Sequence, residues 1–178
     1  MSGTAAKPSS NAETEKSSKE AEVENASEEA LLFLKVVGHG IPIPEEYNTN
    51  GFFSNFLRSF INVHHIQRGQ ISCTILAKLP IANGFGTLHG GAVGSFVEVL
   101  ATACARTVVA EDKELFLGEI SISYLSGTPL NEEVLANASV VKRGRNLTVV
   151  TVEFKLKKTG NLLYISHATF YNMPVARL

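Results

Sequence analysis

A long apolar stretch constrains this chain more than any other feature. Residues 88–110 run for 23 positions with charged side chains only at Glu98 and Arg106. A stretch of this length that is apolar nearly all round is typical of a buried helix. The rest of the chain therefore has to supply the elements that surround a central helix.

Alternating apolar residues predict strands on both sides of this helix. One strand is expected before it, over residues 71–79, and turn residues separate the later candidates. One strand, a long helix and an antiparallel meander predict an α+β fold in which a single sheet wraps a single helix. The four strands expected after the helix span residues 115–125, 133–142, 146–157 and 162–171.

The N-terminal part has a different composition. Residues 1–30 contain three Lys and seven Glu, a net charge of -4, whereas the whole chain of 178 residues carries -1. Residues 1–28 hold too little apolar surface to offset the entropy of ordering, so we expect a disordered acidic leader. An organellar transit peptide is the alternative, but such peptides avoid acidic residues. We expect helical segments that pack on the core over residues 29–62, and a folded domain over residues 63–178.

Charge and cysteine content exclude several classes of protein. Outside residues 1–30 the net charge is only +3, which is unlike the strong basic footprint of a nucleic-acid binder. Cys73 and Cys104 form no CxxC pair and have no His at metal-ligand spacing, so neither a disulfide framework nor a metal site is expected. The longest uncharged run, residues 79–97, contains a Pro and five Gly, and predicts neither a signal peptide nor a membrane span.

The loop before the helix carries a candidate site. Asn83 begins a glycine-rich loop that ends at His89 and Gly90. Glycines at a helix start let the backbone approach a ligand, and the unpaired N–H groups of the first turn point at that ligand. The pattern indicates an oxyanion hole. A dinucleotide fingerprint fits poorly, because the glycine after Gly86 comes four residues later and no parallel βαβ series follows.

Glu98 is the one acid of the apolar helix. A buried carboxylate is costly unless it is paired or functional. Two interpretations stay open: a catalytic acid, or a Glu that lies at a solvent-facing edge or pairs with Arg106. Thr102, four residues on, lies on the same helix face, where its hydroxyl could hold a water against the carboxylate or simply pack.

The spacing of Gly90 and Glu98 bears on assembly. Eight residues of helix separate them by about 12 Å along the axis. One carbonyl group does not readily reach both. If both act on the same carbonyl, the acid must come from a second copy of the chain across a two-fold axis, which predicts a homodimer.

The motif Asn83-x5-His89-Gly90-Gly91, with an acid eight residues after Gly90 and a meander behind it, resembles the hotdog-fold thioesterase superfamily. The resemblance is to the PaaI-like and acyl-coenzyme A thioesterase 13 (thioesterase superfamily member 2) type, over about residues 65–172. It implies a hotdog fold of five to six antiparallel strands around one helix. The implied activity is hydrolysis of a fatty or aromatic acyl-CoA to the free acid and coenzyme A.

The resemblance also implies roles for single residues. The Gly90 N–H and the Asn83 side-chain amide bind the thioester carbonyl. Glu98 from the partner copy acts as base or nucleophile, with Thr102 in support. His89 shapes the loop and the helix start, and a direct acid–base role is the alternative. No cofactor is implied, because coenzyme A is part of the substrate.

A basic turn is expected to hold the phosphates of coenzyme A, with a solvated turn as the alternative. Arg and Lys suit phosphate oxygens. The resemblance further implies a homodimer whose sites lie at the subunit interface and which pairs into a tetramer. The residues of the basic turn are Lys142, Arg143 and Arg145.

Two departures from the family pattern keep other functions open. Glu98 stands where close relatives have Asp, and Leu117 stands where they have a water-orienting Ser. One alternative is a non-catalytic protein that binds acyl-CoA. Another is a hotdog enoyl-CoA hydratase or dehydratase, although the Asp-x-Asn-x-x-His pattern of such enzymes is absent. The final residues Ala176-Arg177-Leu178 fit a peroxisomal address, and a cytoplasmic location is the alternative.

Overall fold

The computed structural model describes residues 25–36 and 40–174. The chain divides into two units, Met1–Asn50 and Gly51–Leu178. Of the first unit, the described part contains a helix over residues 25–36 and the short 3-10 helix η1 (Glu45–Tyr47). Of the leader expected over residues 1–28, residues 1–24 lie outside the described residues. Residues 25–28 belong to the helix over residues 25–36.

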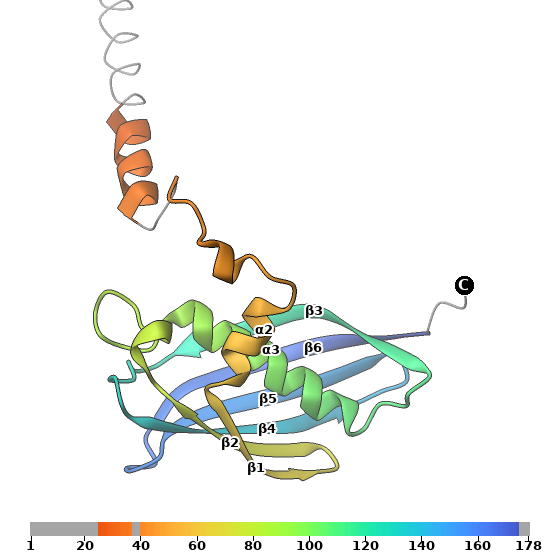
Figure 1. Ribbon diagram of the computed structural model, residues 1–178. Coiled ribbons are helices and arrows are strands. Elements are labelled where there is room, and N and C mark those ends of the chain that lie inside the picture. Colours follow the sequence, from red (N-terminus) through yellow and green to blue (C-terminus); the bar gives the residue numbers. More distant parts are fainter. Residues whose placement is uncertain (1–24, 37–39, 175–178) are drawn as a thin grey trace, which may run out of the picture. The chain divides into compact units, whose positions relative to one another are not determined.

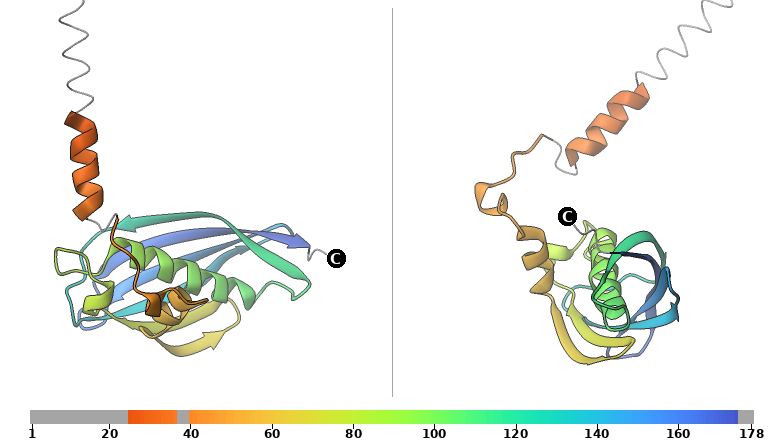
Figure 2. Two further views of the ribbon diagram at one scale, coloured as in Figure 1. Left: turned by 45° about the horizontal axis from the view of Figure 1, so that its top comes forward. Right: turned by 90° about the vertical axis from the view of Figure 1, so that its right-hand side faces the viewer.

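The second unit is built on one antiparallel sheet that curves around a single long helix (Figures 1 and 2). The helix, α3 (Gly90–Arg106), lies against the concave face of the sheet, and the short helix α2 (Phe52–Arg58) precedes the first strand. The strand order is β1-β2-β4-β5-β6-β3, so β1 and β3 form the two edges. The strands are β1 (Ile61–Gln67), β2 (Gln70–Leu76), β3 (Lys113–Tyr124), β4 (Glu133–Arg143), β5 (Leu147–Leu156) and β6 (Leu162–Pro174).

The core lies between the sheet and α3. Along β5 every second side chain is buried, as the alternation in the sequence predicts, and these side chains face the helix. The largest fully buried side chains include Phe96 of α3, Phe154 of β5 and Phe170 of β6. The predicted α+β arrangement, with one sheet around one helix, is confirmed.

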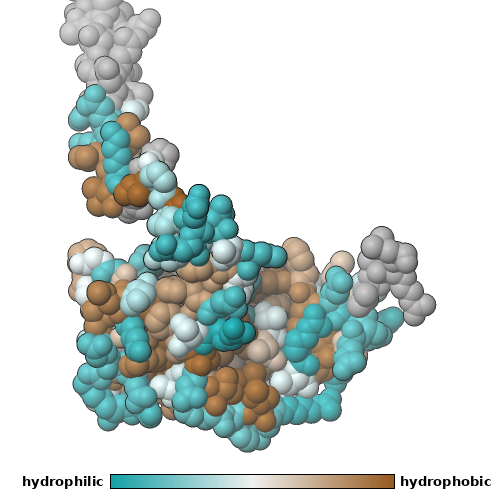
Figure 3. Space-filling model, viewed as in Figure 1, coloured by the Kyte–Doolittle hydropathy of each residue, from teal (hydrophilic) through white to brown (hydrophobic). Residues whose placement is uncertain are grey.

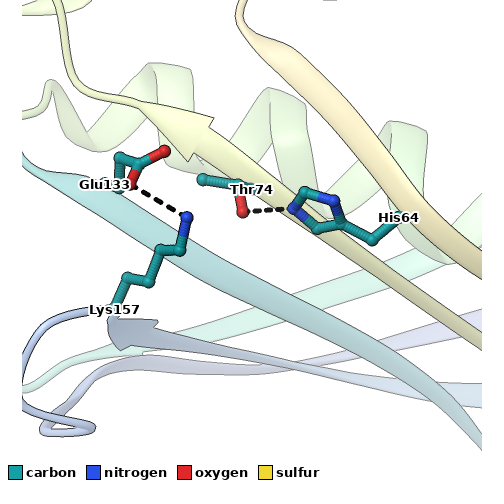
Figure 4. Close-up of polar contacts among 4 residues, drawn as sticks. All are labelled: His64, Thr74, Glu133 and Lys157. Atoms are coloured by element: carbon teal, nitrogen blue, oxygen red, sulfur yellow. Dashed lines mark hydrogen bonds and ion pairs between the residues drawn. The ribbon is translucent and has the colours of Figure 1, made fainter.

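The sequence predicted one strand before the helix, and the structure has two. β1 was missed because only Ile61 is partly buried and the other six residues are exposed, so no alternation marks the strand. β1 is joined to β2 by a tight turn at Gly69, which adopts the left-handed φ of 79°. His64 Nε2 lies 2.5 Å from Thr74 Oγ1 across these strands, and an ion pair of 2.9 Å joins Lys157 to Glu133 (Figure 4).

The expectation that α3 is buried all round is wrong for the single chain. One face, which includes Val93, Phe96 and Val97, packs on the sheet. The opposite face points outward, with Val99 at 42% exposure and Ala103 exposed. Hydrophobic surface is visible around α2 and α3 on this side of the molecule (Figure 3). No helix among the described residues is long and apolar enough to cross a membrane.

Candidate active site

The loop before α3 is closed by the side chain of Asn83. Its Oδ1 accepts hydrogen bonds from the backbone N–H groups of Phe85 (3.0 Å) and Thr87 (3.2 Å). Its Nδ2 lies 2.8 Å from Thr87 Oγ1. The amide predicted to bind the thioester carbonyl thus forms hydrogen bonds within its own loop, and these bonds fix the conformation of the loop that leads into α3. One N–H of its amide group remains for a ligand.

His89 caps the helix. Its Nδ1 accepts a hydrogen bond of 2.9 Å from the Gly91 N–H, and its own backbone N–H donates to Ile81 O at 2.8 Å. A ring nitrogen that accepts a backbone hydrogen bond cannot take up a proton at the same atom without losing that bond. The geometry therefore favours the prediction that His89 shapes the helix start.

Tyr124, at the end of β3, contacts the same helix start. Its hydroxyl donates a hydrogen bond of 2.9 Å to Gly90 O. Burial, and to a smaller extent the neighbouring Tyr164, raise the pKa of Tyr124, so the hydroxyl keeps its proton and remains a donor. The peptide group between Gly90 and Gly91 is consequently held from both sides, at its oxygen by Tyr124 and at its nitrogen by His89.

The backbone N–H of Gly90 is a hydrogen-bond donor without a partner at the start of α3. Among the described residues it makes no hydrogen bond, and Gly90 is partly exposed. N–H groups of a first helical turn have no partner within the helix and carry the positive end of the helix dipole. Gly90 can therefore stabilise negative charge that develops on a carbonyl oxygen.

Glu98 lies two turns further along α3, on the outward face. Its side chain is exposed and forms no ion pair within the described part of the chain. Arg106, the partner weighed from the sequence, instead donates a hydrogen bond of 2.6 Å from Nη1 to Lys113 O. Thr102 is half-buried one turn beyond Glu98. Within one chain the helix keeps Glu98 about 12 Å from Gly90 along its axis.

A basic cavity of about 340 Å³ lies near the C-terminal end of α3. Arg143 and Arg145 line it, as expected for the basic turn, but Lys142 is not among the lining residues. Lys113 contributes a third cation that the sequence did not connect with this turn. Asn172 Nδ2 donates to Gly144 O at 3.1 Å and thereby fixes the turn. α3 separates this cavity from Gly90 of the same chain by about 24 Å.

The two cysteines are unsuited to catalysis. Cys73 and Cys104 are free and buried, and burial raises the pKa of each thiol to about 11. A neutral thiol is a poor nucleophile, since the thiolate is the reactive form. Within residues 25–36 and 40–174, no group of three or more His, Cys, Asp or Glu side chains is placed to hold a metal ion.

Comparison with known proteins places this geometry in context. Residues 85–162 match the model of the thioesterase superfamily. Human acyl-coenzyme A thioesterase 13 is 27% identical over 95 residues, which cover 53% of this chain and 67% of the human protein. A Caenorhabditis elegans protein named as an esterase is 29% identical over 111 residues, 61% of this chain. The match spans 65% of the worm protein, slightly under two thirds.

A solved structure has the same architecture. The crystal structure of zebrafish thioesterase superfamily member 2 matches with a TM-score of 0.64 and 25% identity, over 70% of this chain and 88% of the zebrafish chain. The predicted hotdog fold and the predicted resemblance are confirmed. The part of the chain that matches the family model contains His89, Gly90 and Glu98, whereas Asn83 and α2 precede it.

Proposed function

We propose that this chain, whose residues 85–162 match the thioesterase superfamily and whose fold is that of the hotdog thioesterases, is an acyl-CoA thioesterase. The observation that carries the proposal is the uncommitted Gly90 N–H at the start of α3, next to the Gly90–Gly91 peptide group that Tyr124 and His89 hold in place. A preorganised donor of this kind stabilises an oxyanion without reorganisation during the reaction.

The proposed reaction is hydrolysis of the thioester. The carbonyl oxygen accepts a hydrogen bond from the Gly90 N–H. Glu98 of the partner subunit takes a proton from water, whose oxygen bonds to the carbonyl carbon, or its carboxylate attacks that carbon directly. The C–S bond then breaks, and the sulfur leaves with the bonding electron pair and takes up a proton. After attack by water, the free acid remains. After attack by the carboxylate, a mixed anhydride with Glu98 remains, and water hydrolyses it to the free acid and restores the carboxylate. Thr102 supports the water beside the carboxylate.

A dimer brings the two groups together. β3 is an edge strand with unpaired backbone groups, and the outward face of α3 is partly apolar. A second copy that packs on both would pair the strand edge and bury the apolar face. A two-fold axis beside Gly94, midway between Gly90 and Glu98, would set Gly90 opposite Glu98 of the partner subunit. Gly94 has no side chain to hold the helices apart. We expect an assembly of twice or four times the 19.2 kDa chain mass, measurable by light scattering, the larger being a pair of dimers.

The same antiparallel pairing gives the basic cavity a role. In this register Glu98 of one α3 lies opposite Gly90 of the other, and the C-terminal end of the first helix extends about 12 Å beyond that point. The cavity of one copy would therefore serve the site of its partner. Three cations, Lys113, Arg143 and Arg145, suit the phosphates of coenzyme A.

Removing two of these charges tests the cavity. The double variant Arg143→Gln/Arg145→Gln is expected to raise KM for acyl-CoA about 10- to 100-fold, because hydrogen bonds to charged groups contribute about 1.5–3 kcal/mol, and to change kcat little. Steady-state kinetics in low salt measure both constants. The matched control is Lys142→Gln, which removes a charge from the same turn but outside the cavity. Equal effects of control and double variant would contradict a specific phosphate site.

The assay that tests the activity itself is thiol release from a panel of acyl-CoA thioesters with short, medium, long and aromatic acyl groups. Release of free coenzyme A is expected from at least one class. Tight binding without thiol release would instead identify a non-catalytic acyl-CoA-binding protein. Loss of the enoyl double bond without thiol release would identify a hydratase.

The C-terminal Ala-Arg-Leu sequence supports a peroxisomal location for this activity. These residues lie outside the described part of the structure. Microscopy of a fluorescent fusion, with residues 176–178 present or deleted, tests the address. Peroxisomal signal only with the tripeptide is the expected result, and identical distributions would contradict it.

A further inference from the structure

A second cavity, of about 380 Å³, opens beside the start of α3. Its walls come from α2, from residues 80–82 and from the first two turns of α3. Among the described residues no Asp, Glu, Lys or Arg side chain lines it, and the polar side chains in its lining are those of His89 and Ser95. Its size is within the range of about 300–1,000 Å³ that is usual for small-molecule sites.

α2 forms an aromatic wall of this cavity. Leu57, 3% exposed, anchors the helix in the core, while Phe53 and Phe56 line the cavity. Phe56 also packs edge-on against Phe60, with ring centroids 5.1 Å apart. Phe53 remains 60% exposed, which is costly for an aromatic side chain unless it covers something. Leu57 therefore holds α2 on the core, and α2 presents apolar surface to the cavity.

The cavity borders the proposed carbonyl site. His89 and Gly91, the two neighbours of Gly90, both line it. A thioester whose oxygen is held at the Gly90 N–H thus has an apolar space within one residue of its carbonyl. The basic cavity at the other end of α3 has the opposite character, so a molecule with an apolar end and a phosphate-bearing end matches both surfaces.

We infer that the cavity between α2 and the first turns of α3 holds the acyl chain, and that α2 makes this enzyme select unbranched aliphatic acyl groups long enough to reach Phe53. The inference rests on the proposed thioesterase function and adds to it the class of acyl group. α2 and residues 80–82 precede the part of the chain that matches the family model, so this wall comes from sequence outside the match.

The chain-length profile tests the inference. Burying a methylene group stabilises by about 0.8 kcal/mol, so kcat/KM should rise about fourfold with each added methylene until the cavity is filled. Saturated acyl-CoA thioesters from acetyl to dodecanoyl provide the series. In the wild-type protein we expect the dodecanoyl-to-acetyl ratio of kcat/KM to exceed a hundredfold.

Two variants change the cavity from opposite walls. Ala92→Leu fills it from α3, and Phe53→Ala removes part of the α2 wall at an exposed position that the fold does not depend on. Each is expected to lower the dodecanoyl-to-acetyl ratio at least tenfold. The control is Val63→Leu, which enlarges an exposed apolar residue of β1 that does not line the cavity.

The outcomes separate the two proposals. If no thioester releases thiol, the thioesterase proposal fails and the acyl-chain site fails with it. If thioesters are hydrolysed but the ratio is flat in the wild type, or is unchanged in folded Ala92→Leu and Phe53→Ala, the acyl-chain site is overturned while the thioesterase proposal stands. A ratio that falls in both variants and not in Val63→Leu supports the site.

Discussion

Replacing Glu98 by Gln is expected to lower kcat for thioester hydrolysis about a thousandfold, within the range of 10²–10⁴ that general-base catalysis contributes. Gln keeps the size of the side chain but can neither take a proton from water nor attack the thioester carbon. Glu98 is exposed and makes no ion pair in the described part of the chain, so the free energy of unfolding should change by no more than about 0.5 kcal/mol. Thiol-release kinetics and thermal unfolding measure the two effects.

Glu153→Gln is the matched control for this variant. Glu153 lies on the face of β5 that points away from α3, half-exposed and paired with Lys155 at 2.7 Å. A surface ion pair contributes about 0–1 kcal/mol, so a small loss of stability without loss of activity is expected. Full activity in Glu98→Gln would mean that Glu98 is merely a solvent-facing residue of the helix, the alternative that the sequence left open.

Replacing Gly90 by Pro is expected to lower kcat about 10²- to 10³-fold, the usual cost of losing one oxyanion-hole donor. The substitution removes the N–H and changes little else. Proline is favoured at the first position of a helix, where the N–H has no intrahelical partner. His89 already has the extended conformation that a residue before proline prefers, with φ of -66° and ψ of 131°.

Gly90→Ala separates the N–H from the side chain. An added Cβ would lie 3.5 Å from Tyr124 Cε1, an ordinary van der Waals contact, so the alanine variant should fold and keep the N–H. We expect it to retain kcat within about fivefold, because the oxyanion donor is intact. Similar losses in the proline and alanine variants would show that crowding against Tyr124, and not the missing donor, causes the defect.

Much of the fold follows from patterns within single segments. The alternation of β5 and the apolar stripe of α3 that packs on the sheet each reflect burial of that segment against the rest of the chain. β1 was not predicted because an edge strand that is exposed on both faces does not need alternating apolar and polar residues. The outward face of α3 shows that an apolar pattern in a sequence predicts only that the surface is buried by some partner. It does not tell whether the same chain or another copy supplies that cover.

The candidate site could be proposed from the sequence where its residues are close together in the chain. His89, Gly90 and Glu98 lie on one loop and helix, and a helix fixes their spacing. Tyr124 and Lys113 reach the site and the basic cavity from β3, and no local signal distinguishes them from other strand residues. The hydrogen bonds of the Asn83 amide within its loop could not be predicted either, because the same side chain can form hydrogen bonds with a ligand or with its own loop.

In the proposed mechanism, one active site is shared by two copies of the chain. Co-expression of Glu98→Gln and Gly90→Pro on differently tagged chains tests it directly. In a mixed dimer, one site combines an intact Gly90 N–H with an intact Glu98 from the other copy, and the second site has neither. Random pairing should therefore restore about a quarter of the wild-type thiol-release rate per chain, although each variant alone is nearly inactive. A mixture that is no more active than the separate variants would contradict the shared site.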